Sequence, residues 1–135
     1  MSAVHLRGKK TPAKPDGDPI KRKPPAPKHL SPFARAEWDR VLPMLVQREL
    51  ICRADLGMVE AYCVARGLVV ELEYRRRQKG VGDKEMLAML RQQDKASLTA
   101  ARLSASLGLD PSSRARLLNE AAQGDGEYGP NPLDF

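Results

Sequence analysis

The sequence predicts an all-α protein, in which four helices, two of them forming a long antiparallel hairpin, lie between disordered N- and C-terminal tails. Three observations support this fold class. Ala, Leu, Arg and Glu dominate the middle of the 135-residue chain, whereas aromatic residues make up only 4% of it. Apolar residues recur with helical spacing over residues 33–49, 51–79 and 83–107. Glycines and prolines separate these stretches and crowd both ends.

Charge and proline content divide the chain into three parts. Residues 1–30 carry the whole net charge of +6 and six of the 11 prolines. Such a segment buries too little apolar surface to offset its chain entropy, so we expect a disordered basic arm. Residues 31–122 form the expected helical domain. Residues 123–135 are acidic and rich in glycine and proline, and we expect them to be disordered too.

The first helix has a clear start at Ser31-Pro32, because serine favours the N-cap and proline the first helical position. It should run from residue 33 to about residue 49. Pro43 lies inside this stretch and should kink or split the helix. Trp38 could stack on a nucleic-acid base, but a single tryptophan on an apolar helical stripe is typical of a core residue.

Residues 51–79 read as one helix of seven turns, with Cys52 at its N-cap and Asp55 near its positive end. This helix has two apolar stripes on nearly opposite sides. The first stripe consists of Leu56, Val59, Cys63 and Val70. The second consists of Ala61, Val64, Leu68 and Leu72. A helix with two apolar stripes is covered on both sides, so one side can pack on its own chain and the other on a second copy.

The third helix should run from residue 83, capped by Asp83 after the tight reversal at residues 80–82, to residue 107. It also has two apolar stripes, and the short turn makes it the antiparallel partner of the second helix. Gly108 should end it in the left-handed conformation. Asp110-Pro111 then starts a short fourth helix.

The sequence does not decide which stripe of each long helix faces a neighbouring copy. We assign to contacts between copies the second stripe of residues 51–79 and part of one stripe of residues 83–107. These residues are Ala61, Val64, Leu68, Leu72, Met89, Leu103 and Leu107.

Basic residues form clusters in the arm and at the end of the second long helix. The candidates for contact with DNA phosphates are Arg7, Lys9, Lys10, Lys14, Lys21, Arg22, Lys23, Lys28, Arg75, Arg76, Arg77 and Lys79. Two plainer explanations stay open. The arm could be a solubilising tail. The basic side chains within residues 75–79 could simply interact with the negative end of the helix dipole.

The chain shows none of the usual signs of an enzyme. It has no phosphate-cradling glycine loop, no metal-ligand cluster and no nucleophile paired with histidine, so we expect neither catalysis nor a cofactor or metal. Cys52 and Cys63 lie too far apart along one helix for a disulfide, which fits a reducing cytosolic setting. No apolar run approaches membrane-spanning length, so we expect a soluble protein.

Several segments together resemble the small subunit of the terminase of tailed bacteriophages. The proline-rich lead-in is similar over residues 24–31, the first helix over Ala36-Glu37-Trp38, and the entry to the second helix over residues 50–63. The most specific match is Leu107-Gly108-Leu109-Asp110-Pro111-Ser112-Ser113-Arg114-Ala115-Arg116-Leu117. Asp110 stands where the family usually has threonine, and Cys52 where it has a capping threonine or serine.

The resemblance implies a non-catalytic protein of viral genome packaging, located in the host cell cytoplasm. Family members assemble into rings larger than dimers, bind double-stranded viral DNA, and recruit or regulate the large subunit, which carries the ATPase and nuclease. The resemblance therefore implies that this chain is a ring-forming subunit and that its C-terminus is a candidate docking site for the large subunit. The residues of that site would be Leu133, Asp134 and Phe135.

Two other functions fit the same features. A small dimeric transcriptional regulator could use the arm and the helical body to bind DNA, and it would differ from a ring in its stoichiometry. A scaffold without a nucleic-acid partner would show no binding to DNA even at low salt.

Overall fold

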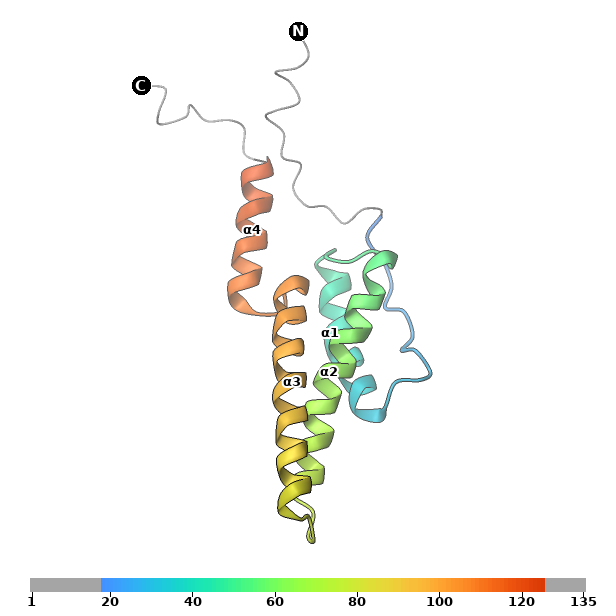
Figure 1. Ribbon diagram of the computed structural model, residues 1–135. Helices are drawn as coiled ribbons and strands as arrows, with labels where there is room; N and C mark the ends of the chain where they lie inside the picture. Colours follow the sequence, from blue (N-terminus) through green and yellow to red (C-terminus); the bar gives the residue numbers. More distant parts are fainter. Residues whose placement is uncertain (1–17, 126–135) are drawn as a thin grey trace, which may run out of the picture.

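The computed structural model describes residues 18–125 (Figure 1). Regular structure within these residues is helical throughout, without a strand, which confirms the all-α prediction. The elements are α1 (Pro32–Gln47), the short 3-10 helix η1 (Arg53–Asp55), α2 (Leu56–Arg76), α3 (Asp83–Leu107) and α4 (Pro111–Asp125). None of the described helices is long and apolar enough to cross a membrane.

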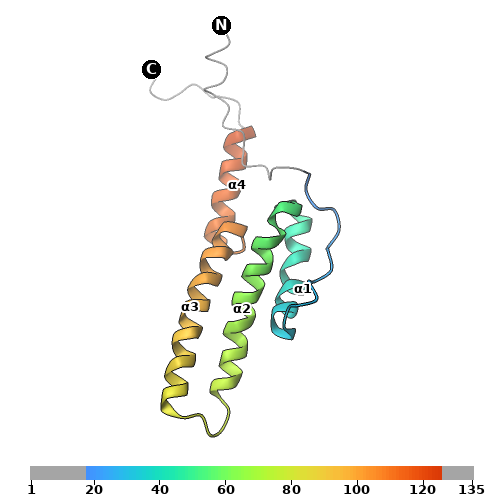
Figure 2. The same ribbon diagram turned by 45° about the vertical axis from the view of Figure 1, so that its right-hand side comes forward.

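The packed body consists of three helices rather than the expected four. Helix α2 lies in the middle and packs against α1 on one side and α3 on the other, as both views show (Figures 1 and 2). Helix α4 contacts only α3 and extends past the end of the hairpin (Figure 2). Most of its surface is open to solvent, and Leu118 is 70% exposed.

Helix α1 begins as the sequence predicts. The Ser31 hydroxyl accepts a hydrogen bond from the backbone N–H of Ala34 at 3.1 Å. Pro43 does not split the helix, which continues to Gln47. The proline ring lies on the exposed side, where water can satisfy the backbone carbonyl that loses its helical partner.

The stretch that we expected to be one helix over residues 51–79 is shorter and begins differently. Ile51 and Cys52 are extended and buried, and only then do η1 and α2 follow. The Asp55 carboxylate accepts a hydrogen bond from the Cys52 backbone N–H at 2.9 Å, which fixes this entry. At the other end α2 stops at Arg76, so Arg77 and Lys79 lie beyond the helix.

The hairpin of α2 and α3 closely follows the prediction. Gly82 is the N-cap of α3, so Asp83 is the first helical residue rather than the cap. Gly108 ends α3 with a φ of 71°, in the left-handed region that glycine adopts without strain. Helix α4 extends to Asp125, so the predicted tail of residues 123–135 starts within a helix.

The core lies between α1 and α2. Its largest fully buried side chains are Trp38, Leu42, Leu45, Ile51, Val41, Val59 and Cys63. Trp38 is 2% exposed and is therefore a core residue, as predicted. Burial raises the pKa of the Cys63 thiol, and the nearby negative charge of Glu37 raises it further, to about 12. This cysteine is therefore an inert packing residue.

Part of the predicted disordered arm is packed on the body. The Trp38 indole N–H donates to the Pro24 carbonyl at 3.0 Å, and the Ile20 backbone N–H donates to the Ile51 carbonyl at 3.0 Å. Leu30 belongs to the core, with 6% of its surface exposed. Residues 18–30 are thus an extended strap along the body, so the prediction of disorder was wrong for this part; the rest of the arm lies outside the described residues.

Candidate nucleic-acid and subunit interfaces

The strap carries four of the basic residues assigned to DNA contact, namely Lys21, Arg22, Lys23 and Lys28. All four are at least partly exposed. Lys23 forms an ion pair with Asp39 at 2.6 Å, and Lys21 lies 3.5 Å from the Glu49 carboxylate. These pairs reduce the charge that two of the lysines can offer to a phosphate. Arg7, Lys9, Lys10 and Lys14 lie outside the described residues.

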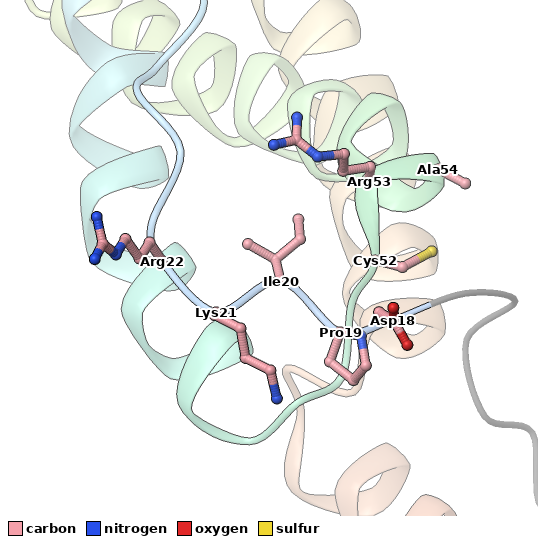
Figure 3. Close-up of a pocket in the computed structure, with 8 residues that line it drawn as sticks. All are labelled: Asp18, Pro19, Ile20, Lys21, Arg22, Cys52, Arg53 and Ala54. Carbon is pink, nitrogen blue, oxygen red and sulfur yellow. The ribbon is translucent and has the colours of Figure 1, made fainter.

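A hollow of about 540 Å³ separates the start of the strap from the segment that enters α2. Figure 3 shows Lys21 and Arg22 on one wall and Arg53 on the other. Asp18 is the only carboxylate among the lining residues, so the hollow is positively charged. Sequence reasoning missed Arg53, because it lies far from Arg22 in the chain and only the folded strap brings the two together.

The basic residues at the end of α2 are engaged with acidic residues of the same helix. Arg75 pairs with Glu71 and Arg77 with Glu73, both at 3.2 Å. Arg76 pairs with Glu73 at 2.7 Å, and its side chain is only 26% exposed. These contacts favour a structural explanation for Arg76, whereas Lys79 is exposed.

Gln93 of α3 ties the two helices of the hairpin together. Its side-chain amide donates to the Val69 carbonyl at 3.1 Å and to Glu73 at 3.0 Å, and its oxygen accepts from Arg76 at 2.9 Å. The hydrogen bond from Gln93 lowers the pKa of the Glu73 carboxyl below its usual value. The group is a fixed polar clamp near the hairpin tip.

A second polar cluster lies beneath the surface between α1 and α2. The Tyr62 hydroxyl donates to the Glu37 carboxylate at 2.7 Å, and Arg40 donates to the same carboxylate with two of its nitrogens. Burial works against ionisation of Glu37, but the hydrogen bonds from Arg40 and Tyr62 outweigh it and hold its pKa below the ordinary value. Burial, together with that carboxylate, raises the pKa of Tyr62 to about 12.

Several residues assigned to contacts between copies instead pack within one chain. Leu72, Met89 and Leu107 are 2%, 8% and 5% exposed, and Leu103 packs against the core. They cover the surface between α2 and α3 or the end of the core. Their assignment to a subunit interface was wrong, because a helical wheel cannot tell which of two apolar stripes meets the other helix of a hairpin.

The remaining predicted contact residues are open to solvent. Val64 and Leu68 are 46% and 37% exposed, and with Ala61 they line a groove beside the α2–α3 seam. The outer stripe of α3 is also exposed, with Leu87 at 49% and Leu98 at 73%. The hairpin thus presents two separate apolar surfaces, of which the sequence-based assignment included only the first.

Comparison with known proteins gives the chain a family. A family model described as phage terminase, small subunit, matches residues 34–124, from the start of α1 to the end of α4. The chain belongs to the small-subunit family of phage terminases. Searches among curated proteins and among solved structures found no match.

Membership of the terminase small-subunit family places the chain in phage DNA packaging. Small subunits of terminases are in general non-catalytic. Among the described residues, no group of three or more His, Cys, Asp and Glu side chains could hold a metal ion.

The family signature around residues 107–117 forms the turn from α3 into α4. Asp110 caps α4, since its carboxylate accepts hydrogen bonds from the backbone N–H and the hydroxyl of Ser113, both at 2.7 Å. The hydrogen bond from the Ser113 backbone N–H lowers the pKa of Asp110 most, and the bond from the Ser113 hydroxyl lowers it further. Aspartate is among the best helix N-caps, so Asp110 starts α4 as the sequence predicts.

Proposed function

We propose that this terminase small subunit assembles into a ring of more than two copies in the host cytoplasm, binds double-stranded viral DNA, and recruits or regulates the large subunit. The observation that carries this proposal is the family match over residues 34–124. It rests on the whole helical body rather than on a short motif.

Apolar surface left uncovered by a single chain supports the assembly. Val64, Leu68, Leu87 and Leu98 are all more than a third exposed. Apolar residues that are exposed side by side mark surfaces that bind another protein. These side chains lie on two different surfaces of one hairpin. Contacts between unlike surfaces join copies head to tail and give rings when the rotation closes.

Basic residues concentrated before α1 support the binding of DNA. Residues 1–30 carry the net charge of the chain. The folded strap places Arg22 across the hollow of Figure 3 from Arg53, so both arginines line the same hollow. Arginine and lysine gain affinity for DNA by releasing condensed counterions. Repetition of these residues around a ring would turn weak contacts into strong binding through avidity.

The strap changes how the DNA-binding part of the proposal should be tested. Deleting residues 1–30 would remove Leu30 and the carbonyl bonded by Trp38, and so would damage the core. Deleting residues 1–17 removes Arg7, Lys9, Lys10 and Lys14 and leaves the strap intact. The slope of log K against log salt should then become shallower by up to ~3.6, because each phosphate that the chain neutralises adds ~0.9 to it.

Fluorescence anisotropy with duplex DNA at several salt concentrations measures this slope. A deletion of residues 126–135, which contain no basic residue, is the matched control and should leave the slope unchanged. An unchanged slope after deletion of residues 1–17 would move the DNA contacts onto the folded part. Absence of binding at low salt would remove DNA binding from the proposal.

Recruitment of the large subunit is assigned to Leu133, Asp134 and Phe135, which lie outside the described residues. An acidic segment with an apolar end suits a peptide that orders when it docks. Deleting residues 133–135 should abolish co-purification with the large subunit while leaving assembly and DNA binding unchanged. Retained co-purification would exclude this segment as the docking site.

A further inference from the structure

The two apolar surfaces of the hairpin differ in shape. The groove is lined by Ala61, Val64 and Leu68 of α2 and by Ala96 of α3. The outer face of α3 is formed by Leu87 and Leu98, with the small exposed Ala101 beside them. Since successive residues of a helix turn by about 100°, Leu87 and Leu98 lie roughly opposite Met89 and Ala96, which face α2. One surface is concave and the other is a ridge.

Charged residues border both surfaces with the same spacing. Glu60 and Glu71, 11 residues apart, lie along the α2 edge of the groove, next to Val64 and Leu68 on the helical wheel. Arg91 and Arg102, also 11 residues apart, lie along one edge of the α3 outer face. Eleven residues span ~16 Å of helix, so the two acidic and the two basic groups are equally far apart.

The charges of the two surfaces are opposite along one edge of each. Across the groove, the acidic edge of α2 is followed by apolar residues and then by Lys95 on the α3 side. Across the outer face, the Arg91 and Arg102 edge is followed by the leucines, and Asp94 lies within this apolar stripe, between Leu87 and Ala101 on the helical wheel. The ridge therefore fits the groove in shape, and its arginine row is opposite in charge to Glu60 and Glu71, which contact His29 and Arg75 within the single chain.

We propose that the α3 outer face of one copy docks into the groove of the next copy, with Arg91 and Arg102 beside Glu60 and Glu71 of the neighbour. Each copy then uses two unlike surfaces, so the contact is head to tail and can repeat around a ring. The inference rests on the ring in the proposed function and names the surfaces that build it.

Single substitutions on each surface test the pairing. Leu98→Lys places a charge on the ridge, and Val64→Lys places one in the groove. Both native side chains are exposed, at 73% and 46%, so circular dichroism should show both variants folded. Native mass spectrometry should find each variant alone as a monomer. Leu118→Lys is the matched control, because Leu118 is 70% exposed but lies on α4, and it should assemble as the wild type does.

Mixing the two variants gives the sharpest result. The Leu98→Lys chain keeps an intact groove, and the Val64→Lys chain keeps an intact ridge. An equimolar mixture should therefore form a one-to-one heterodimer and nothing larger, because the second contact of each chain is blocked. Homodimers of either single variant would show that a surface pairs with itself and would overturn the proposal.

Charge reversal provides a second test that leaves the apolar residues in place. Arg102→Glu should raise the concentration needed for half-maximal assembly about tenfold or more, and adding Glu71→Arg in the same chain should restore it. Failure of restoration would overturn the pairing of these edges. A wild-type ring that survives Leu98→Lys and Val64→Lys would refute this interface alone, whereas a monomeric wild type would refute the ring itself.

Discussion

At the scale of single residues, Glu37 is the charged group on which the packing of α1 against α2 depends. Its carboxylate is 10% exposed and accepts hydrogen bonds from Arg40 and Tyr62. A buried charge is tolerated only when such partners surround it. The sequence did not predict this cluster, because Glu37 and Tyr62 lie 25 residues apart in the chain.

Replacing Glu37 with glutamine should destabilise the fold by about 1–3 kcal/mol, because two donors lose a charged acceptor. The effect should depend on pH. The pKa of Glu37 is lower in the folded chain than its ordinary value of 4.5, so its contribution is present above that pH and is lost as the pH falls through the folded value. Urea denaturation should therefore show the gap between wild type and variant closing below about pH 4.5. A constant gap across this range would contradict the role of ionised Glu37.

Gly67 is required by a close approach of two helices. A Cβ atom at this position would lie 2.6 Å from the backbone nitrogen of Ala34, and backbone cannot move aside as a side chain can. Gly67→Ala should therefore destabilise the chain by about 1–3 kcal/mol despite the better helix propensity of alanine. Gly57 of the same helix has open space around its Cβ position, so Gly57→Ala should stabilise by about 0.5–1 kcal/mol. Thermal unfolding of both variants at equal concentration tests this, and equal shifts would exclude the close contact.

At the scale of elements, local signals predicted where helices start and stop, and long-range contacts decided the rest. The bounds of α3 were predictable because Gly82 and Gly108 mark its ends. The strap was missed because residues 18–30 look like an unfolded segment in composition. One signal could have revealed it, since a buried tryptophan such as Trp38 needs an acceptor for its indole N–H, and Pro24 supplies that acceptor.

The hairpin of α2 and α3 should loosen near its tip when the Gln93 clamp is removed. Gln93→Ala takes away the bonds to Val69 and Glu73 and leaves Arg76 with fewer partners. Hydrogen exchange should become faster in residues 69–90 and stay unchanged in α1. Ser97→Ala is the matched control, because Ser97 is exposed on the same helix and lies outside the groove. Equal exchange in the two variants would show that the clamp contributes nothing to the hairpin.

At the scale of the whole molecule, a single chain leaves two complementary surfaces uncovered. The helical pattern predicted more apolar surface than one chain can bury, and Val64, Leu68, Leu87 and Leu98 are each more than a third exposed. It could not identify the surfaces, because the two stripes of α3 look alike in sequence and only the packing of Met89 and Ala96 against α2 distinguishes them. The stripe with Leu87 and Leu98 is visible in the sequence, but only the folded chain shows that it is the exposed one.

The most direct test of head-to-tail assembly is native mass spectrometry of the purified chain over a range of salt concentrations. We expect a single closed oligomer well above a dimer, with no ladder of larger species, because a closed ring leaves neither surface free. Its stability should fall as salt rises, since charged edges border the contact. A monomer or a dimer at all salt concentrations would contradict the ring and would favour a small dimeric DNA-binding protein instead.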